Sequence, residues 1–219
     1  MMKFTTLSIV ALMAASSAAN AASFSSPSAT FTGDVIDFNA FDGYLLPQGG
    51  SNSLSLDYGV TLTTDGLATV GQNAFDLNDN GLWSVVGNAN RDGTFLSAEF
   101  NNANDSIHFS FASGMQKVGI FINQYQDIGE SNSLNFFAYD INGNVLETRT
   151  INVDTAWDSY DEGMFVGFER ASADVYRFGV SGGTFVMDNL TISAVPEPET
   201  VAMLLAGLGL LSFAARRRA

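Results

Sequence analysis

The middle of the chain alternates between apolar and polar residues with a period of two, which is the pattern of half-buried β-strands. The clearest case is segment 106–111, where Ile107, Phe109 and Phe111 alternate with two serines and a histidine. Segment 176–180 repeats the pattern, with Arg177 on the polar side. The segments that we expect to form strands are 35–38, 60–63, 94–100, 106–111, 117–122, 134–139, 145–153, 164–168, 176–180 and 184–192.

Glycine, asparagine and aspartate separate these segments. Asn142 and Gly143 lie between two of them, and this pair accepts the positive φ values of a tight hairpin turn. No part of the body has a sustained helical period. Short strands at a spacing of roughly 8 to 12 residues predict an all-β fold, either an antiparallel sandwich or a barrel.

The N-terminal residues 1–21 have the pattern of a secretory signal peptide. Lys3 precedes an apolar stretch over 7–15, and small residues follow, ending in Ala19-Asn20-Ala21. We expect cleavage after Ala21 or Ala22, followed by export through the inner membrane. The folded domain is therefore expected over residues 22–194.

The C-terminal residues 195–219 combine Pro196-Glu197-Pro198, an apolar run over 201–215 and a cluster of Arg216, Arg217 and Arg218. As a helix the run would be about 22 Å long, which is short for a bilayer core of about 30 Å. The arginines would hold its end in the cytoplasm, so the body would lie outside. A permanent membrane anchor after a proline-containing linker is the alternative.

This three-part tail resembles the PEP-CTERM sorting signal of Gram-negative bacteria. The resemblance implies that exosortase, a membrane protease, recognises the tail and cuts near Pro196-Glu197-Pro198. The protein would be transiently anchored in the membrane by its C-terminal helix and then released to the cell surface or extracellular matrix, in association with exopolysaccharide or biofilm.

The body shows a second resemblance through short pieces, among them VIDFNAF, LDYGVTL, FFAYDINGNVL, FVGFE and FVMDNLTIS. These pieces look like the jelly-roll-like β-sandwich bodies that often precede PEP-CTERM tails. The resemblance implies an antiparallel jelly-roll-like β-sandwich with the architecture of carbohydrate-binding modules. Fold analogy supplies no activity.

Composition excludes several kinds of function. The body has 21 acidic and five basic residues, which gives a net charge of −16. Nucleic acid is excluded as a partner, because phosphate binding needs clustered Lys and Arg. Such an acidic surface attracts divalent cations. The chain has no cysteine, so disulfides, thiol nucleophiles and thiolate metal sites are absent.

No catalytic constellation emerges, and we expect a protein that is not an enzyme. Segment 179–183 matches G-x-S-x-G around Ser181, but a strand is expected after it instead of a helix. We interpret it as a glycine-rich turn between strands. The one histidine, His108, lies on the polar face of its strand and receives no role. A glycosidase needs two carboxyl groups across a cleft, and the sequence cannot single out such a pair.

A structural calcium ion is the one candidate cofactor. Asp76, Asn78 and Asn80 precede a glycine, as oxygen ligands do in EF-hand loops. The twelfth position of such a loop is Gly87, where the motif requires glutamate, so an EF-hand is excluded. A polar turn or a calcium loop of another kind remains.

A second candidate calcium site follows from the resemblance to carbohydrate-binding modules, which commonly hold calcium between their first and last strands. Asp34 and Asp37 lie early in the body and Asp188 lies in the last segment. Asp188 lies in a mostly apolar segment, so it either faces solvent or is buried with a partner. We favour the solvent-facing interpretation.

The densest group of aromatic and acidic residues surrounds Trp157 and Tyr160. It is either a sugar-stacking loop or a solvated loop anchored by one buried ring. The favoured hypothesis is an exported, non-enzymatic surface protein. A carbohydrate-binding module acting on exopolysaccharide is the alternative, and an esterase or glycosidase is a distant third.

Overall fold

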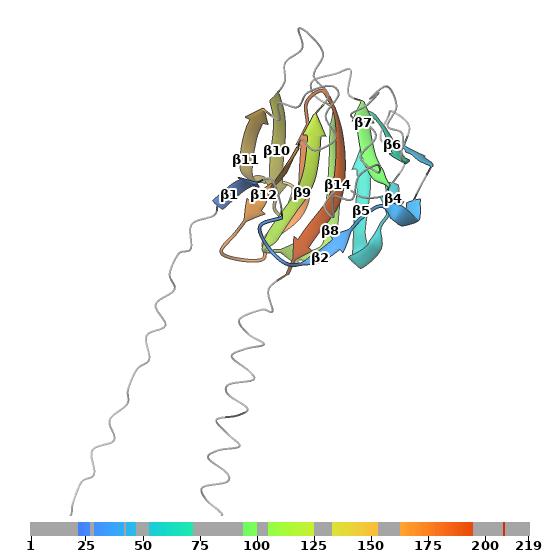
Figure 1. The fold of residues 1–219 in the computed structure, drawn as a ribbon. Coiled ribbons are helices and arrows are strands. Elements are labelled where there is room, and N and C mark those ends of the chain that lie inside the picture. The colour runs from blue at the N-terminus through green and yellow to red at the C-terminus, as the bar shows by residue number, and fades with distance from the viewer. Residues whose placement is uncertain are drawn as a thin grey trace, which may run out of the picture.

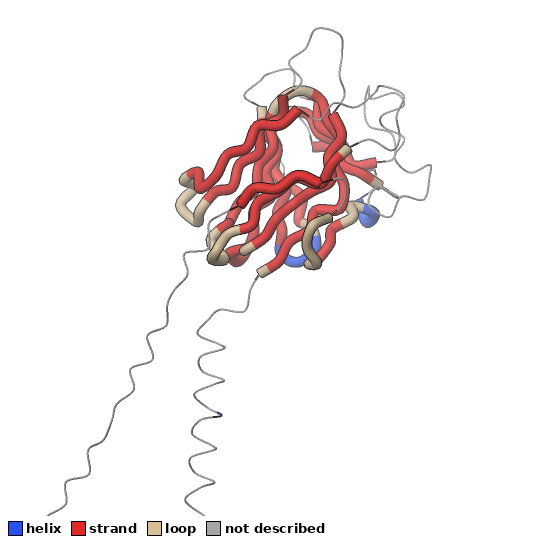
Figure 2. Tube along the Cα trace, turned by 60° about the vertical axis from the view of Figure 1, so that its left-hand side comes forward, coloured by secondary structure: helices blue, strands red, loops and turns tan. Residues whose placement is uncertain are grey.

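The computed structural model describes residues 22–26, 29–41, 43–46, 53–71, 94–99, 105–124, 133–152, 163–194 and 208. These residues form two antiparallel β-sheets that pack face to face as a jelly-roll-like β-sandwich (Figures 1 and 2). The all-β fold expected from the alternation is therefore confirmed.

The sheet at the front of Figure 1, called sheet A here, has eight strands in the order β1-β12-β9-β14-β7-β6-β3, and β2 also pairs with β14. The strands of sheet A are β1 Ala22–Ser26, β2 Asp34–Ile36, β3 Tyr44–Leu46, β6 Leu67–Gly71, β7 Phe95–Glu99, β9 Lys117–Gln124, β12 Met164–Glu169 and β14 Thr184–Ser193.

The second sheet, called sheet B, has six strands in the order β11-β10-β13-β8-β5-β4. Its strands are β4 Ser53–Ser55, β5 Val60–Thr64, β8 Ser106–Met115, β10 Ser133–Tyr139, β11 Val145–Asn152 and β13 Val175–Ser181. Two short 3-10 helices, η1 Asn39–Phe41 and η2 Asp57–Gly59, precede β3 and β5. Consecutive strands often belong to different sheets: β12 lies in sheet A, β13 in sheet B and β14 in sheet A again.

Alternation fills the space between the sheets with apolar side chains. Along β8 the inward residues Ile107 and Phe109 are fully buried, whereas the residues between them are only half-buried. The ring of Phe178 lies at the centre of this core. Its centroid is 6.3 Å from that of Phe109, 6.2 Å from that of Phe136 and 6.1 Å from that of Phe168 on the opposite sheet. Such ring contacts add to the burial that holds the sheets together.

All ten expected strands are present, within a few residues of their expected ends. The sequence interpretation missed β1, β3, β4 and β6, which have three or five residues each. The expected hairpin between β10 and β11 is also present, and the amide of Gly143 donates to the carbonyl of Asp140. Of the Asn-Gly pair only Gly143 has a positive φ, of 82°.

The buried aromatic residues do not all lie between the two sheets. Phe95, Phe121 and Phe165 form a second buried cluster with Val186, which faces away from sheet B. Phe24 of the edge strand β1 stacks on Phe165 with a centroid separation of 5.7 Å. This cluster therefore attaches the N-terminal strand to sheet A.

An ion-pair network joins the two sheets at one end. Arg170 follows β12, and its guanidinium is 2.6 Å from Glu147 on β11 and 2.7 Å from Asp174. The pKa of Asp174 lies below its usual value, because its carboxylate accepts hydrogen bonds from Arg170. The connection from sheet A to sheet B is thus fixed to an edge strand.

Within the described residues, no helix is long and apolar enough to cross a membrane. The signal peptide expected over 1–21 and the C-terminal helix expected over 201–215 lie outside these residues, apart from Leu208.

Candidate functional site

The outer face of sheet B combines short polar side chains with a compact group of larger ones. Strand pairing places Gly179 of β13 between Phe137 of β10 and His108 of β8, and it places Arg177 beside Tyr139. The other residues that point outward from these and the neighbouring strands are mostly serine and threonine. We call Phe137, Tyr139, His108 and Arg177 around Gly179 the outer-face cluster.

The glycine at the centre leaves room for the side chains around it. A Cβ atom at Gly179 would lie 2.6 Å from Nδ1 of His108 and 3.3 Å from Cε2 of Tyr139. No real side chain tolerates the first contact, so any larger residue here would displace the imidazole. Gly179 thus allows the rings of His108 and Tyr139 to contact each other over its backbone, edge to face, with centroids 5.8 Å apart.

The Tyr139 ring also contacts the charged residue of the cluster, Arg177. The guanidinium carbon of Arg177 lies 4.1 Å from the centroid of the Tyr139 ring, and the Phe137 ring stacks beside it with a centroid separation of 6.0 Å. A cation over a tyrosine ring is attracted by the negative face of the ring. Burial raises the pKa of the Tyr139 hydroxyl, so this ring stays neutral.

The histidine is held by a short chain of hydrogen bonds. Ser106 Oγ lies 2.7 Å from Asp65 Oδ2 and 2.8 Å from His108 Nε2. The serine has one proton, which it donates to the carboxylate, so the imidazole Nε2–H donates to the serine. His108 Nδ1 then keeps a lone pair, and it has no partner among the described residues.

The same surroundings keep the imidazole neutral. Burial lowers the pKa of His108, the nearby Arg177 lowers it further, and Asp65 acts in the opposite direction. Among the described residues, the cluster therefore combines the cation of Arg177 and the nearby carboxylate of Asp65 with a neutral histidine.

The hydrogen-bond order differs from that of a nucleophilic triad, in which the histidine bridges the serine and the acid. Here Ser106 bridges His108 and Asp65. The G-x-S-x-G segment is a turn between strands, as interpreted from the sequence: Ser181 ends β13, Gly182 and Gly183 have φ values of 106° and 68°, and β14 follows.

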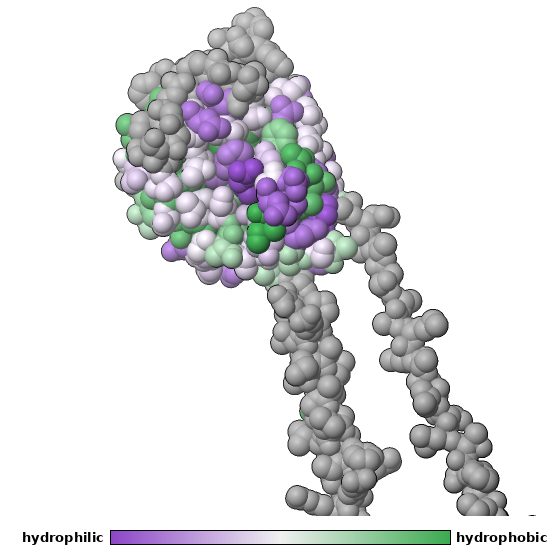
Figure 3. All heavy atoms as spheres, turned by 180° about the vertical axis from the view of Figure 1, so that it is seen from behind, coloured by the Kyte–Doolittle hydropathy of each residue, from purple (hydrophilic) through white to green (hydrophobic). Residues whose placement is uncertain are grey.

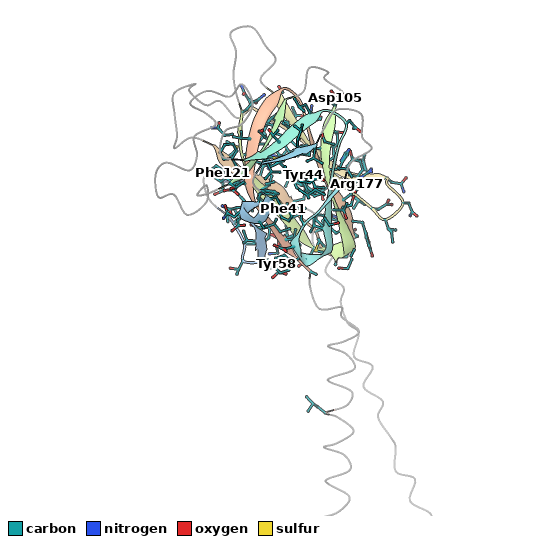
Figure 4. All side chains as sticks on the ribbon, turned by 90° about the vertical axis from the view of Figure 1, so that its right-hand side faces the viewer. Phe41, Tyr44, Tyr58, Asp105, Phe121 and Arg177 are labelled. Carbon is teal, nitrogen blue, oxygen red and sulfur yellow. The ribbon has the colours of Figure 1, made fainter. Side chains whose placement is uncertain are left out.

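Figure 3 shows the outer face of sheet B, with hydrophilic and apolar residues side by side toward β10 and β11. Figure 4 shows Arg177 on the opposite side of the sandwich from Phe121, which belongs to the outer face of sheet A. The outer-face cluster is thus well separated from the aromatic cluster around Phe121.

The acidic residues expected near calcium are only partly brought together. The strand with Asp34 does pair with β14, but Asp34 is opposite Ile192. Asp37 follows β2 and is exposed, and its carboxylate accepts hydrogen bonds from Asn39. No group of three or more His, Asp or Glu side chains in the described ranges could hold a metal ion.

The solvent-facing interpretation of Asp188 was wrong. Its exposure is 1%, and its Oδ1 accepts the amide of Asn189 at 2.7 Å. Asn189 has a φ of 53°, and the pairing of β14 with β9 shifts register at this point. A β-bulge therefore turns the carboxylate onto the backbone of its own strand.

Several expected site residues lie outside the described part of the chain. They are the sorting residues Pro196, Glu197, Pro198, Arg216, Arg217 and Arg218, the candidate calcium ligands Asp76, Asn78 and Asn80, and the candidate sugar-binding residues Trp157 and Tyr160.

The sequence interpretation did not identify the outer-face cluster, although a signal was present. The alternation in segments 134–139 and 176–180 already places Phe137, Tyr139 and Arg177 on the polar sides of their strands. An aromatic residue on a polar side is the informative exception to the pattern. The pairing of β10 with β13 was the missing information.

Comparison with known proteins identifies the C-terminal end. Residues 194–218 match the PEP-CTERM protein-sorting motif. The motif marks an exported protein that is sorted by exosortase, and it covers the tail only. No curated protein sequence matches the chain.

Three solved structures are similar to the body at low identity. A DUF4465 family protein from Bacteroides caccae has 10% identity and a TM-score of 0.49, over 75% of this chain and 100% of that one. The CBM22-1 xylan-binding domain from Paenibacillus barcinonensis has 10% identity and a TM-score of 0.32, over 77% and 100%. The active domain of a tailspike protein of bacteriophage CBA120 has 14% identity and a TM-score of 0.35, over 62% of this chain. The match spans 19% of the tailspike chain.

Proposed function

We propose that this chain is an exported, non-catalytic surface protein whose body binds polysaccharide through the outer face of sheet B. The observation that carries the proposal is the outer-face cluster. Sugars present apolar C–H faces that stack on aromatic rings, and they present hydroxyl groups that need directed hydrogen bonds. Phe137 and Tyr139 supply adjacent rings on an open sheet, and the serine and threonine side chains around them supply donors and acceptors.

The sorting motif supports the cellular part of the proposal. A PEP-CTERM protein is delivered to the outside of the cell, where exopolysaccharide or a biofilm matrix would be the natural ligand of such a face. Exosortase is the processing partner and acts on the tail. In this proposal the body binds sugar without cleaving it. Glycoside cleavage needs two carboxyl groups that face each other across a cleft, and the outer-face cluster has beside it the carboxylate of Asp65, which accepts a hydrogen bond from Ser106.

The test measures retardation of the exported protein in native gels that contain polysaccharide from the producing cells. We expect the wild type to be retarded and Phe137→Ala and Tyr139→Ala to migrate freely. Tyr44→Ala is the matched control, because Tyr44 is an exposed aromatic residue of sheet A. The proposal fails if both cluster variants are retarded like the wild type. Release of new reducing ends by the wild type would contradict the non-catalytic part.

A further inference from the structure

We propose that Arg177 makes the outer face of sheet B selective for acidic polysaccharides, whose sugars carry carboxylate groups as in uronic acids. This inference rests on the proposed function and names its ligand class. The basic side chains of the described residues differ in whether they have a polar partner.

Three of the four cations in the described ranges have polar partners. Lys117 is 2.7 Å from Glu169, and Arg170 pairs with Glu147 and Asp174. Arg149 donates to Ser25 Oγ at 2.7 Å. Arg177 has no ion pair or side-chain hydrogen bond within these ranges, and its Nε is buried without an acceptor.

An unpaired arginine is unexpected in this body, which has 21 acidic and five basic residues. With about four carboxylates for each cation, neutralising Arg177 would need only one acidic residue on a neighbouring strand. The strands beside it instead present Tyr139 and Ser110. Asp65 is close enough to affect the pKa of both His108 and Tyr139, but its carboxylate accepts from Ser106. Within the described residues, the face therefore retains a guanidinium that no carboxylate pairs with.

The ring beneath Arg177 orients this charge. The guanidinium carbon lies 4.1 Å from the centroid of the Tyr139 ring, and this contact holds the guanidinium in place without neutralising its charge. A guanidinium is a planar fork that binds a carboxylate by two parallel hydrogen bonds, which a hydroxyl group cannot match. A sugar that stacks on Phe137 would bring a carboxylate substituent toward Arg177.

The surroundings of Arg177 make its contact with a sugar carboxylate the main attraction for an acidic chain. His108 is neutral and contributes no second cation near neutral pH, because burial and Arg177 both lower its pKa. The net charge of the body repels a polyanion at longer range. An acidic chain should therefore bind only where Arg177 overcomes this repulsion.

The test uses a matched pair of probes: a homopolymer of a uronic acid, and the same polymer with its carboxyl groups reduced to primary alcohols. Dissociation constants of the full exported protein are measured by calorimetry at physiological salt with chelator present. We expect tighter binding of the acidic polymer. Arg177→Gln should weaken it by about ten- to hundredfold and leave binding of the reduced polymer unchanged.

Two further variants control for charge and folding. Arg149→Gln removes the same net charge at a different place, so it should bind as the wild type does. Arg177→Lys keeps the charge but loses the fork, so it should fall between the wild type and Arg177→Gln. Thermal midpoints verify that each variant is folded, and Arg177→Lys decides the question if Arg177→Gln is not.

The outcomes separate the two proposals. Equal binding of both polymers, unaffected by Arg177→Gln, would overturn the inference and leave the proposed function standing. Acidic-polymer binding that needs divalent cations and survives Arg177→Gln would also overturn it. Binding of neither polymer nor the native polysaccharide would contradict the proposed function itself.

Discussion

At the scale of single residues, His108 shows how an open sheet can still control protonation. Its imidazole fills the space above Gly179, donates from Nε2 to Ser106, and has an unpaired Nδ1 within the described residues. Protonation would place a second N–H donor in this buried position beside the charge of Arg177. The folded state therefore favours the neutral ring.

This preference makes stability depend on pH. The folded-state pKa of His108 lies below the unfolded value of about 6.5. Below pH 6.5 the unfolded chain binds a proton that the folded chain does not, so the free energy of unfolding should fall as the pH decreases from 6.5 to the folded pKa. Above pH 6.5 this contribution is fully retained.

Denaturant unfolding at several pH values tests this, with His108→Gln as the control. The variant should lack the decrease that begins near pH 6.5. His108 is the one histidine of the chain, so its imidazole resonances report the folded pKa directly. A folded pKa at or above 6.5 would contradict the assignment.

Calcium binding is a second prediction at this scale. We expect millimolar calcium to raise the thermal midpoint beyond the effect of matched sodium chloride, because Asp76, Asn78 and Asn80 would supply oxygen ligands in a strongly acidic body. Asp76→Asn should remove the shift. Asp188→Asn should retain it, because Asp188 already accepts the amide of Asn189 and stands in no described metal cluster. The absence of any calcium-specific shift would remove metal from this site.

Residue-level interpretation failed where geometry depends on a local irregularity. Asp188 lies in a mostly apolar segment that reads as an alternating strand, so the pattern favoured solvent exposure. The bulge at Asn189 breaks the alternation and turns the carboxylate onto the backbone. Asparagine adopts a positive φ more readily than most residues, but a single asparagine inside a strand pattern does not by itself predict a bulge.

At the scale of elements, the strands with strong alternation were predictable, because a half-buried strand must place every second side chain in the core. β8 is the best example. The three-residue strands β3 and β4 were missed, because three residues display too little alternation. β2 has the same length and was expected only as part of the longer segment 35–38. Sheet order was not predictable either, since β14 pairs with β2, β7 and β9 through contacts between distant parts of the chain.

The face assignment of β8 can be tested by two neighbouring substitutions. Phe109 is fully buried and lies 6.3 Å from Phe178, whereas Ser110 is half-buried on the outer face. Phe109→Ala should lower the free energy of unfolding by about 3–5 kcal/mol through lost burial and a cavity. Ser110→Ala should change it by less than about 0.5 kcal/mol. Denaturant melts of both variants are the measurement, and equal losses would mean that the alternation is misassigned.

At the scale of the whole molecule, the sorting motif and the proposed polysaccharide-binding face lie in separate parts of the chain. The sorting motif occupies residues 194–218, and β14 ends at Ser193, so the motif begins where the sandwich ends. The composition indicated that nucleic acid is not a partner, and the C-terminal tail indicated export and sorting. The outer-face cluster depends on the pairing of β8, β10 and β13 side by side, which only the three-dimensional structure provides.

This separation predicts the mass of the mature protein. A protease that cuts near Pro196-Glu197-Pro198 would leave the sandwich intact, because its last strand ends at Ser193. The apolar run over 201–215 is also short for a permanent anchor. Intact mass spectrometry of the extracellular fraction should find a protein that lacks about the first 21 residues and everything shortly after Pro198. Replacing Pro196, Glu197 and Pro198 by alanine should keep the protein with the membrane, whereas Arg177→Gln should be processed normally. Extracellular protein that still carries Arg216, Arg217 and Arg218 would show that the tail is an ordinary C-terminal segment and not a processed signal.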